Sequence, residues 1–265
     1  MKNRQHIQAL ILRILFVVVL LFLWEFSVKS GRLPEFYTSC PTEIAKDLMQ
    51  FYTSGDLYKH AAVTLKEAFI GLFYGSIIGV ATGVLFGQFP FISKIFKPIV
   101  IAIHSIPQLT LAPVYILWFG IGLQSKIFLA GLMAFFNVFF STLGAIQGME
   151  QKLIESANLL GATRFQTLMK VVLPTCTPWI ISGIRAGVGA SLIGAIVGEY
   201  MGAAAGFGWM VAYATSYFNM KRVMSCIFIL LIVGMLLNFS LDKVEKWLLK
   251  WRPQTSLNVG SGDDF

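Results

Sequence analysis

The stretch AFIGLFYGSIIGVATGVLFGQFPFIS, residues 68–93, lies between Glu67 and Lys94 and contains no charged side chain. A helix needs about 20 apolar residues to cross the roughly 30 Å hydrocarbon core of a bilayer, so this stretch can span a membrane. Glycines recur in it at a four-residue interval, which places them along one stripe of the helix and allows close helix packing. These glycines are Gly71, Gly75, Gly79, Gly83 and Gly87. We interpret them as packing residues within the chain rather than as a dimer interface.

Similar charge-poor stretches recur along the chain. Hydrophobic residues make up 56% of the sequence and charged residues 13%, whereas soluble domains carry about 25% charged residues. The sequence therefore predicts an all-α membrane protein with about six transmembrane helices in one domain, residues 1–265. The expected helices lie near residues 7–25, 68–88, 98–119, 127–147, 180–202 and 223–241. The fifth of them repeats the glycine spacing, with Gly183, Gly187, Gly194 and Gly198.

The first expected helix admits a second interpretation. Its apolar run, Ile14 to Trp24, is only a little longer than the apolar region of a secretory signal peptide. A cleavage site with small residues does not follow it, because Glu25 to Lys29 reads EFSVK. We therefore expect a retained transmembrane helix.

Basic residues gather at the ends of the expected helices. If both termini are cytoplasmic, these residues all lie on the cytoplasmic side, as the positive-inside rule requires. They are Lys2, Arg4, Lys94, Lys97, Lys152, Arg164, Lys170, Lys243, Lys246, Lys250 and Arg252. The net charge of +8 is thus explained by membrane topology, and nucleic acid is not an expected partner. Lys221 and Arg222 lie on the opposite side and are not explained by this rule.

The sequence lacks the signatures of several catalytic sites. It has neither a G-x-x-x-x-G-K-[ST] phosphate loop nor an H-E-x-x-H zinc motif. The histidines are isolated, and the cysteines Cys40, Cys176 and Cys226 are too scattered to suggest a disulfide framework or a metal site. We expect no catalytic residue, bound metal or cofactor in this chain, which therefore either conducts passively, uses an ion gradient or takes energy from a partner.

Prolines interrupt the third expected helix at Pro107 and Pro113. Proline removes a backbone hydrogen bond and kinks a helix. At membrane depth such a break occurs where protein or a water-filled cavity supplies other partners. Pro107, with His104 and Gln108 beside it, therefore belongs either to a kinked packing helix or to the wall of a transport pathway, and the sequence favours neither.

Glu199 lies near the end of the fifth expected helix. Carboxylates within membrane helices tend to face a cavity or a partner. We interpret Glu199 as a gate or a helix-locking residue rather than a ligand of the transported solute. The simpler alternative is an interfacial carboxylate that binds nearby backbone or Arg222.

The connection between the fourth and fifth helices, residues 150–178, has the most specific pattern. Leu153 to Leu160 contains good helix formers, Gly161 is a plausible helix terminator, and Leu173-Pro174 is expected to turn the chain back toward the membrane. The sequence thus predicts a short helix-turn-helix on the cytoplasmic side. Its apolar surface in the cytosol predicts a partner protein.

This connection reads Glu155-Ser156-Ala157, then Gly161, then Val171-Val172-Leu173-Pro174. It resembles the E-A-A…G…I-x-L-P signature of permease subunits of binding-protein-dependent ABC importers. The spacing matches throughout, with Ser156 in place of alanine and Val171 in place of isoleucine. The resemblance extends over nearly the whole chain.

Three further stretches resemble the nitrate/sulfonate/taurine branch of that family. They are Ile106 to Gly122, with its L-A-P and W-F-G-I-G sequences, Gly198-Glu199-Tyr200-Met201-Gly202, and Cys40-Pro41-Thr42-Glu43-Ile44. The branch includes importers of nitrate, sulfonates, taurine, bicarbonate and vitamin precursors. The resemblance therefore leaves the solute open.

The resemblance implies an ABC importer permease-type bundle with cytoplasmic coupling helices, multi-pass in the bacterial cytoplasmic (inner) membrane. A second copy of the chain, two ATP-binding cassette ATPase subunits that bind ATP and Mg, and an extracytoplasmic substrate-binding protein are the implied partners. The implied ATPase-coupling residues are Glu155, Ser156, Ala157, Gly161, Leu173 and Pro174.

Three other classes remain as alternatives. An ion-coupled secondary transporter usually has inverted repeats and intramembrane acids, whereas Glu199 stands alone and we find no such repeat. A channel requires a selectivity filter or a ring of charges, and a membrane enzyme requires clustered histidines or aspartates. The sequence shows neither feature.

Overall fold

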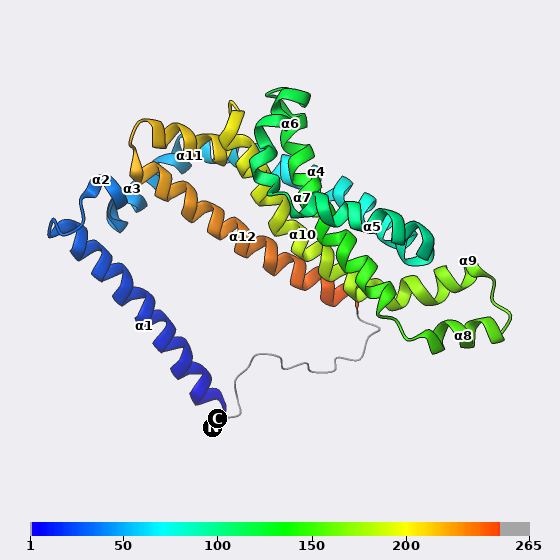
Figure 1. The fold of residues 1–265 in the computed structure, drawn as a ribbon. Coiled ribbons are helices and arrows are strands. Elements are labelled where there is room, and N and C mark those ends of the chain that lie inside the picture. Colours follow the sequence, from blue (N-terminus) through cyan, green and yellow to red (C-terminus); the bar gives the residue numbers. More distant parts are fainter. Residues whose placement is uncertain (1, 250–265) are drawn as a thin grey trace.

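The computed structural model describes residues 2–249, and these form a long bundle of helices (Figure 1). The helices are α1 (Lys2–Lys29), α2 (Glu35–Thr38), α3 (Pro41–Thr53), α4 (Asp56–Gln88), α5 (Pro90–Ser105), α6 (Ala112–Phe119), α7 (Leu123–Gln147), α8 (Gln151–Leu159), α9 (Arg164–Thr167), α10 (Leu173–Gly202), α11 (Phe207–Ser216) and α12 (Met220–Leu248). A 3₁₀ turn, η1 (Gln108–Leu111), precedes α6, and a π-helical turn, η2 (Leu168–Val172), precedes α10. Lys250 and Arg252, expected in a cytoplasmic tail, lie outside the described residues.

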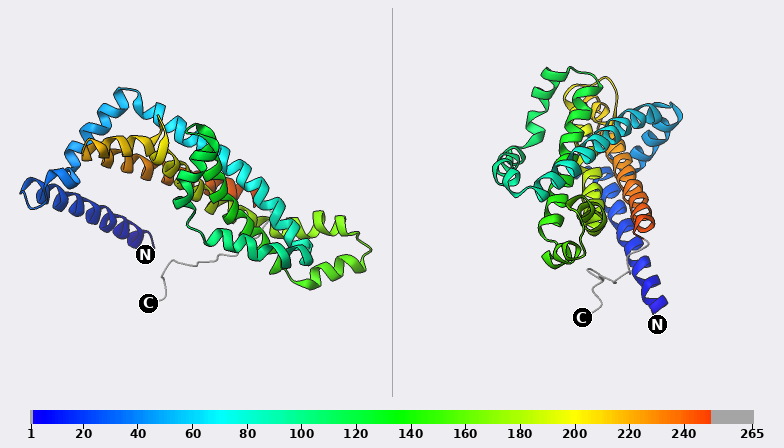
Figure 2. Two further views of the ribbon diagram at one scale, coloured as in Figure 1. Left: turned by 45° about the horizontal axis from the view of Figure 1, so that its top comes forward. Right: turned by 90° about the vertical axis from the view of Figure 1, so that its right-hand side faces the viewer.

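The lengths of these helices confirm an all-α membrane protein. Five helices are long and apolar enough to cross a membrane, and a sixth span results if α5 and α6 are counted as one bent span. Helices α8 and α9 project from one end of the bundle, which we call the α8–α9 end, while α3 and α11 lie at the opposite, α3–α11 end (Figures 1 and 2). Helix α1 lies at the edge of the bundle, where it contacts α2 and α3, and its Trp24 ring stacks on Phe228 of α12.

The third expected helix, residues 98–119, is interrupted near Pro107, as its prolines predicted, although the helix before the break begins earlier than expected. α5 already begins at Pro90, and a 78° bend separates it from the segment that ends at Phe119. The residue before a proline avoids the helical conformation, and Ile106 is accordingly extended before Pro107. The side-chain amide of Gln108 donates to the Ile103 carbonyl at 2.6 Å and to the Ile106 carbonyl at 3.1 Å, so it replaces backbone bonds lost at the break.

Helix α7 lies at the centre of the bundle, with α4 and α10 packed against it. The glycine stripe of α4 faces α7: a Cβ atom added at Gly71 would lie 2.6 Å from the Ala130 Cβ, and one added at Gly83 would lie 2.7 Å from the Thr142 Cβ. From the other side, a Cβ atom at Gly194 of α10 would lie 2.9 Å from the Ala130 Cα. Ala130 is fully buried where the three helices meet.

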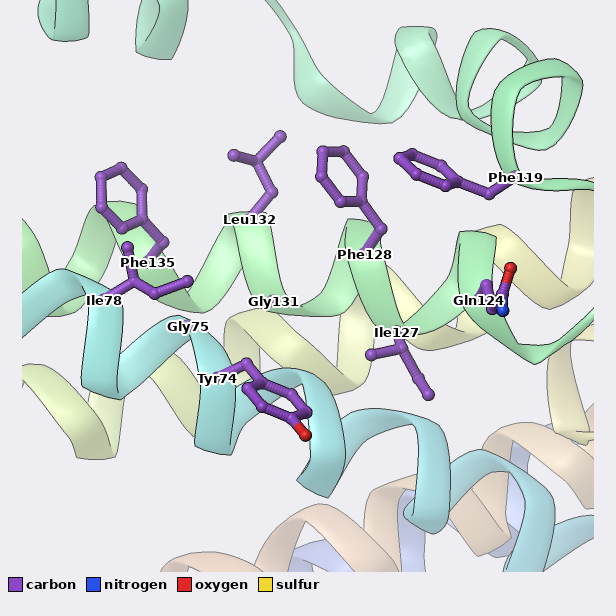
Figure 3. A pocket seen from close by; sticks show the side chains of 10 residues that line it. All are labelled: Tyr74, Gly75, Ile78, Phe119, Gln124, Ile127, Phe128, Gly131, Leu132 and Phe135. Carbon is purple, nitrogen blue, oxygen red and sulfur yellow. The ribbon is translucent and has the colours of Figure 1, made fainter.

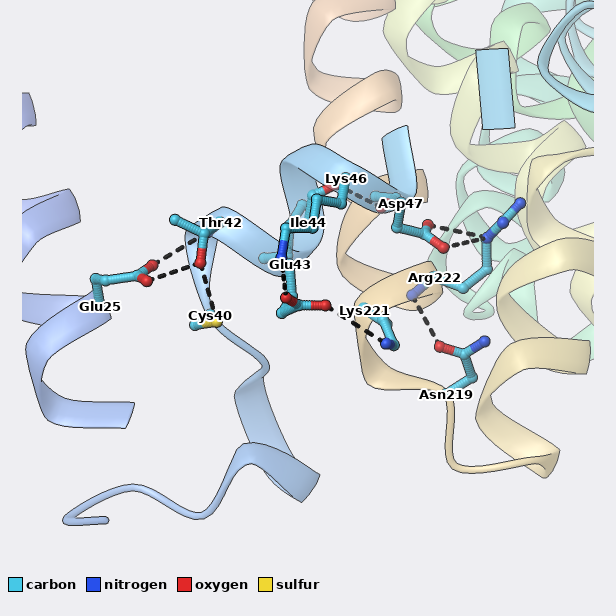
Figure 4. A network of polar contacts seen from close by, with 11 residues as sticks. Glu25, Cys40, Thr42, Glu43, Ile44, Lys46, Asp47, Asn219, Lys221 and Arg222 are labelled. Atoms are coloured by element: carbon cyan, nitrogen blue, oxygen red, sulfur yellow. Dashed lines mark hydrogen bonds and ion pairs between the residues drawn. The ribbon is translucent and has the colours of Figure 1, made fainter. Parts of the chain in front are cut away.

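Charged side chains join α1, α3 and α12 at the α3–α11 end (Figure 4). The Arg222 side chain pairs with Asp47 at 2.9 Å and lies 4.3 Å from the centre of the Phe51 ring, and Lys221 pairs with Glu43 at 3.6 Å. Lys221 and Arg222, which the positive-inside rule does not explain, thus bind acidic residues of α3. The expected alternative pairing of Arg222 with Glu199 is not observed.

We predict that Gly79→Leu destabilises the bundle. A Cβ atom at Gly79 would lie 3.0 Å from both the Phe135 carbonyl oxygen and the Val138 Cβ, so a leucine must separate α4 from α7. Overpacking of this kind typically costs about 1–3 kcal/mol. Thermal unfolding in detergent measures the loss. Gly189→Leu is the matched control, because Gly189 is exposed and has no atom within 4 Å of an added Cβ. Equal melting temperatures for the two variants would show that the α4–α7 contact is not tight.

Candidate functional site

The first backbone N–H groups of α11 are bound by side chains from α4 and α10. The first N–H groups of a helix lack partners within the helix. Here the N–H of Gly206 donates to His60 Nδ1 at 2.9 Å, that of Phe207 to Thr64 Oγ1 at 2.9 Å, and that of Gly208 to Glu199 Oε2 at 2.7 Å. We call His60, Thr64 and Glu199 the α11 cap. Because its members belong to α4 and α10, the α11 cap attaches the start of α11 to two other helices.

Glu199 is the central member of the α11 cap. Its side chain is fully buried, and its second oxygen, Oε1, accepts a hydrogen bond from Thr64 Oγ1 at 2.7 Å. Burial of a carboxylate costs several kcal/mol unless hydrogen bonds and an opposite charge compensate. The structure places Glu199 in a helix-locking position, joining α4, α10 and α11.

The ammonium of Lys126 on α7, which is 1% exposed, brings a positive charge into the same region of the bundle. It also donates to the carbonyls of Ile121, Gly122 and Gly202, the Gly122 bond measuring 3.0 Å. These carbonyls lie just after α6 and at the last residue of α10, where a helix dipole attracts a cation. Lys126 therefore stabilises the ends of α6 and α10.

Two glycines make room for this arrangement. Gly206 has a φ of +107°, a conformation that side chains disfavour, and a Cβ atom there would overlap the Glu199 carboxylate. At Gly208 a Cβ atom would lie 2.8 Å from the Glu199 Cβ. The start of α11 can approach Glu199 only because both positions lack side chains.

Sequence reasoning found Glu199 but missed its partners. His60, Thr64, Glu67 and Lys126 are distant from it along the chain, and Thr64 lies 135 positions away. The sequence did contain one signal for two of these partners. Glu67 and Lys126 lie at the edges of charge-free stretches, where their side chains are expected to be buried. Glu67 is 3% exposed, and its Oε2 atom has no hydrogen-bond partner among the described residues.

The other residues expected in a pathway lie at the bend between α5 and α6. The exposed His104 ring packs against Phe136 and Phe140 of α7, with ring centres 4.6 Å and 5.1 Å apart. Gln108 accepts a hydrogen bond from the Tyr115 hydroxyl at 3.0 Å in addition to supporting the break. Pro107 caps the 3₁₀ turn. These contacts place His104, Pro107 and Gln108 together as supports of the bend.

A groove of about 660 Å³ runs along α4 and α7 beside the end of α6 (Figure 3). Aromatic and aliphatic side chains form most of its wall, including Tyr74, Phe128 and Phe135. None of its lining residues is charged. An anionic solute would therefore find no opposite charge on this wall of the described chain.

Helices α8 and α9 form the second candidate site, which we call the lever (residues 151–172). The N–H of Ala162 binds the Ala157 carbonyl at 3.1 Å and that of Gly161 binds the Asn158 carbonyl at 3.0 Å, the pattern of a Schellman C-cap. Gly161 supplies the required positive φ, +78°. On the other side of the turn, Thr163 and Gln166 form a capping box that begins α9. Caps on both sides hold the turn of the lever.

The chain turns at Gly161 and not at Leu173-Pro174, which corrects the sequence-based prediction. The helical segment from Arg164 continues through the π-helical turn into α10 and ends at Gly202. Pro174 lies in the first turn of α10. Proline lacks a backbone N–H, and a single π-helical turn can lie within an otherwise continuous α-helix. The lever is therefore continuous with α10.

The lever exposes large apolar side chains. Leu159 and Leu160 are each 88% exposed and Phe165 is 70% exposed. Glu155 and Ser156 are also exposed, whereas Ala157 is buried. The Ser156 hydroxyl bonds to the Lys152 carbonyl within α8. Exposed apolar side chains of this kind mark a protein or membrane contact.

A bundle of apolar spans with such a lever at one end defines a membrane component of a transport system. The chain belongs to the family of binding-protein-dependent transport system inner membrane components, whose sequence model matches residues 75–251. It is thus a multi-pass permease subunit of an ABC importer, as the resemblance predicted.

Individual relatives agree with this assignment. The chain is 31% identical to SsuC of Bacillus subtilis, a permease named for aliphatic sulfonate transport, over 90% of this chain and 87% of that protein. It is 30% identical to the riboflavin transport system permease RibX of Chloroflexus aurantiacus, over 89% and 88%. A solved structure of the MetNI methionine ABC transporter, in inward-facing conformations, matches 71% of this chain and 94% of that chain with 25% identity and a TM-score of 0.63.

We predict that Glu199→Ala destabilises the protein. The substitution leaves the Gly208 N–H and the Thr64 hydroxyl buried without their acceptor. Each unsatisfied buried donor costs about 1–3 kcal/mol. Thermal unfolding should therefore occur at a clearly lower temperature than in Glu43→Ala, a control at the α3–α11 end whose carboxylate is partly exposed. A loss no greater than that of the control would show that the Glu199 carboxylate does not hold α11.

Proposed function

We propose that two copies of this chain enclose one transport pathway and that two ATPase subunits bind their levers. The lever supports this proposal directly, since Leu159, Leu160 and Phe165 offer an apolar surface outside the membrane spans. The solute is delivered by a binding protein at the α3–α11 end. ATP and Mg bind to the ATPase subunits rather than to this chain, which has no phosphate loop.

The proposed orientation places both termini and the lever in the cytoplasm. The α8–α9 end carries Lys94, Lys97, Lys152, Arg164 and Lys170, in agreement with the positive-inside rule. At the α3–α11 end, by contrast, Lys126 and Arg222 are bound by backbone carbonyls or by an acidic side chain. The positions of Lys94, Lys97, Lys152, Arg164 and Lys170 thus support a cytoplasmic α8–α9 end.

The path of α10 suggests how the lever couples to the far end of the bundle. α10 has 30 residues, which corresponds to about 45 Å of helix. Its first turn follows the lever, and Glu199 near its last turn holds α11 through the α11 cap. A movement of the lever is therefore transmitted along one helix to the α11 cap. In this proposal ATPase closure shifts α10 and alters the opening of the pathway at the α3–α11 end.

Of the proposed coupling residues, Gly161 has the clearest structural role, since it forms the turn of the lever. Glu155 and Ser156 lie exposed on α8, and Ala157 accepts the bond that closes the C-cap. Leu173 and Pro174 connect the lever to α10. The transported solute is proposed to be small, in the range of the relatives' named solutes, sulfonates and riboflavin, with nitrate, taurine, bicarbonate and other vitamin precursors as further candidates.

We predict that purification with the ATPase yields two permease chains and two ATPase subunits. The lever offers each ATPase one docking surface, and a pathway between two copies requires two such surfaces. Size-exclusion chromatography with light scattering measures the stoichiometry. An active complex with one copy of this chain and no second permease would contradict the proposal.

We predict that Gly161→Val abolishes most transport while the protein still folds. A β-branched residue resists the φ of +78°, so the turn of the lever is distorted outside the membrane spans. Transport and binding-protein-stimulated ATP hydrolysis in proteoliposomes should both fall sharply, while size exclusion shows an intact permease. Gly161→Asn is the matched control, because asparagine tolerates this conformation. It should retain much more transport than valine, and normal transport by Gly161→Val would show that the lever is only a connector.

A further inference from the structure

A second cavity, of about 600 Å³, lies at the α8–α9 end. The end of α4, the start of α5 and the end of α7 enclose it, and α8 begins only a few residues after Gln147. Its polar lining consists of Ser93, Lys94, Lys97 and Gln147. The remaining lining residues are apolar or glycine, and none is acidic.

The positive charges of this cavity lack a counter-charge. Lys94 and Lys97 are three positions apart within the first two turns of α5, and the first turn of that helix contains no acidic residue. Like charges at this spacing repel each other, and the positive end of the helix dipole adds to the repulsion. Within the described chain, Lys94 forms no ion pair, and Lys97 binds only the neutral Gln147 Oε1, at 3.2 Å. Neither ammonium group is therefore neutralised by an acidic side chain of the described residues.

The hydroxyl of Ser93 also lines the cavity. Ser93 is 7% exposed overall, and its hydroxyl is not used in a hydrogen bond to the described residues, so it can donate to a bound group. A hydroxyl, two ammonium groups and the side-chain amide of Gln147 together match the oxygens of a phosphate group, which accept several hydrogen bonds at once.

We propose that this cavity binds the phosphate headgroup of an anionic phospholipid. Basic pockets between transmembrane helices on the cytoplasmic side are suited to such headgroups. The outer surface of α5 continues from the cavity with exposed apolar side chains, Phe91, Ile95, Phe96 and Ile99, which acyl chains can cover. A pathway for a hydrated free anion would instead require polar side chains along this surface. A lipid headgroup and a free anion would both present oxyanion oxygens to the cavity. The apolar surface of α5 favours the lipid as their source.

The test uses the permease–ATPase complex, delipidated in detergent and titrated with phosphatidylglycerol or phosphatidylcholine. Native mass spectrometry counts the bound lipids, and thermal unfolding measures the stabilisation. Phosphatidylglycerol should bind and stabilise, and phosphatidylcholine should not. Each lysine near an anionic headgroup contributes about a fivefold gain in affinity, so Lys94→Ala with Lys97→Ala should weaken binding about 30-fold.

The control, Lys243→Ala with Lys246→Ala, removes the same charge from the α8–α9 end of α12. It should keep the affinity for phosphatidylglycerol, and equal losses in the two double variants would overturn the proposal. Ser93→Ala removes a group of the site without a charge change and should also weaken binding. It replaces the double variant as the test if the double variant fails to fold. Unchanged affinity in Ser93→Ala would then also contradict the site. Displacement of phosphatidylglycerol by equimolar inorganic phosphate or ethanesulfonate would show that the cavity binds free oxyanions. That result would overturn the proposal of a lipid site.

Discussion

The close approach of α4 and α10 to α7 is the contact on which the rest of the structure depends. In a bilayer, helices gain little from burying apolar surface against each other, so tight packing and hydrogen bonds must supply the attraction. Glycines provide that packing on both sides of α7. At Ala130 the three helices meet so closely that a methyl group at Gly71 or Gly194 would overlap its neighbour. The positions of α4 and α10 relative to each other are therefore set by backbone contact.

This spacing is what allows a polar cluster inside the bundle. Thr64 on α4 and Glu199 on α10 can share a hydrogen bond of 2.7 Å only because both helices are held against α7. The α7 helix contributes Lys126, whose hydrogen bonds close the ends of α6 and α10. The α11 cap thus derives from the same packing that builds the core. A transporter that must move α11 has to break these buried bonds, which makes the α11 cap a natural point of control.

The two ends of the bundle differ in how their polar groups are satisfied. At the α3–α11 end, Asp47 pairs with Arg222, which lies over the Phe51 ring, and the N–H groups of Gly206, Phe207 and Gly208 at the start of α11 are bound by side chains. At the α8–α9 end, the lever exposes apolar side chains and the Ser93–Lys97 cavity lacks a counter-charge. Large apolar side chains that lack cover within the described chain therefore mark the lever as a contact surface.

The sequence by itself determined the membrane class, most of the spans, the glycine stripe and the position of the lever. Hydropathy, the spacing of small residues and the C-cap at Gly161 are local properties, because they depend on neighbours within a few turns of helix. The tertiary structure alone decided the partners of Glu199, the role of Lys126 and the binding of Lys221 and Arg222 to α3. It also decided the 78° angle at the break that Pro107 predicted, because His104 beside the break packs against Phe136 and Phe140 of α7. These features depend on contacts between segments far apart in the chain, and such contacts are fixed only when α4 and α10 pack against α7.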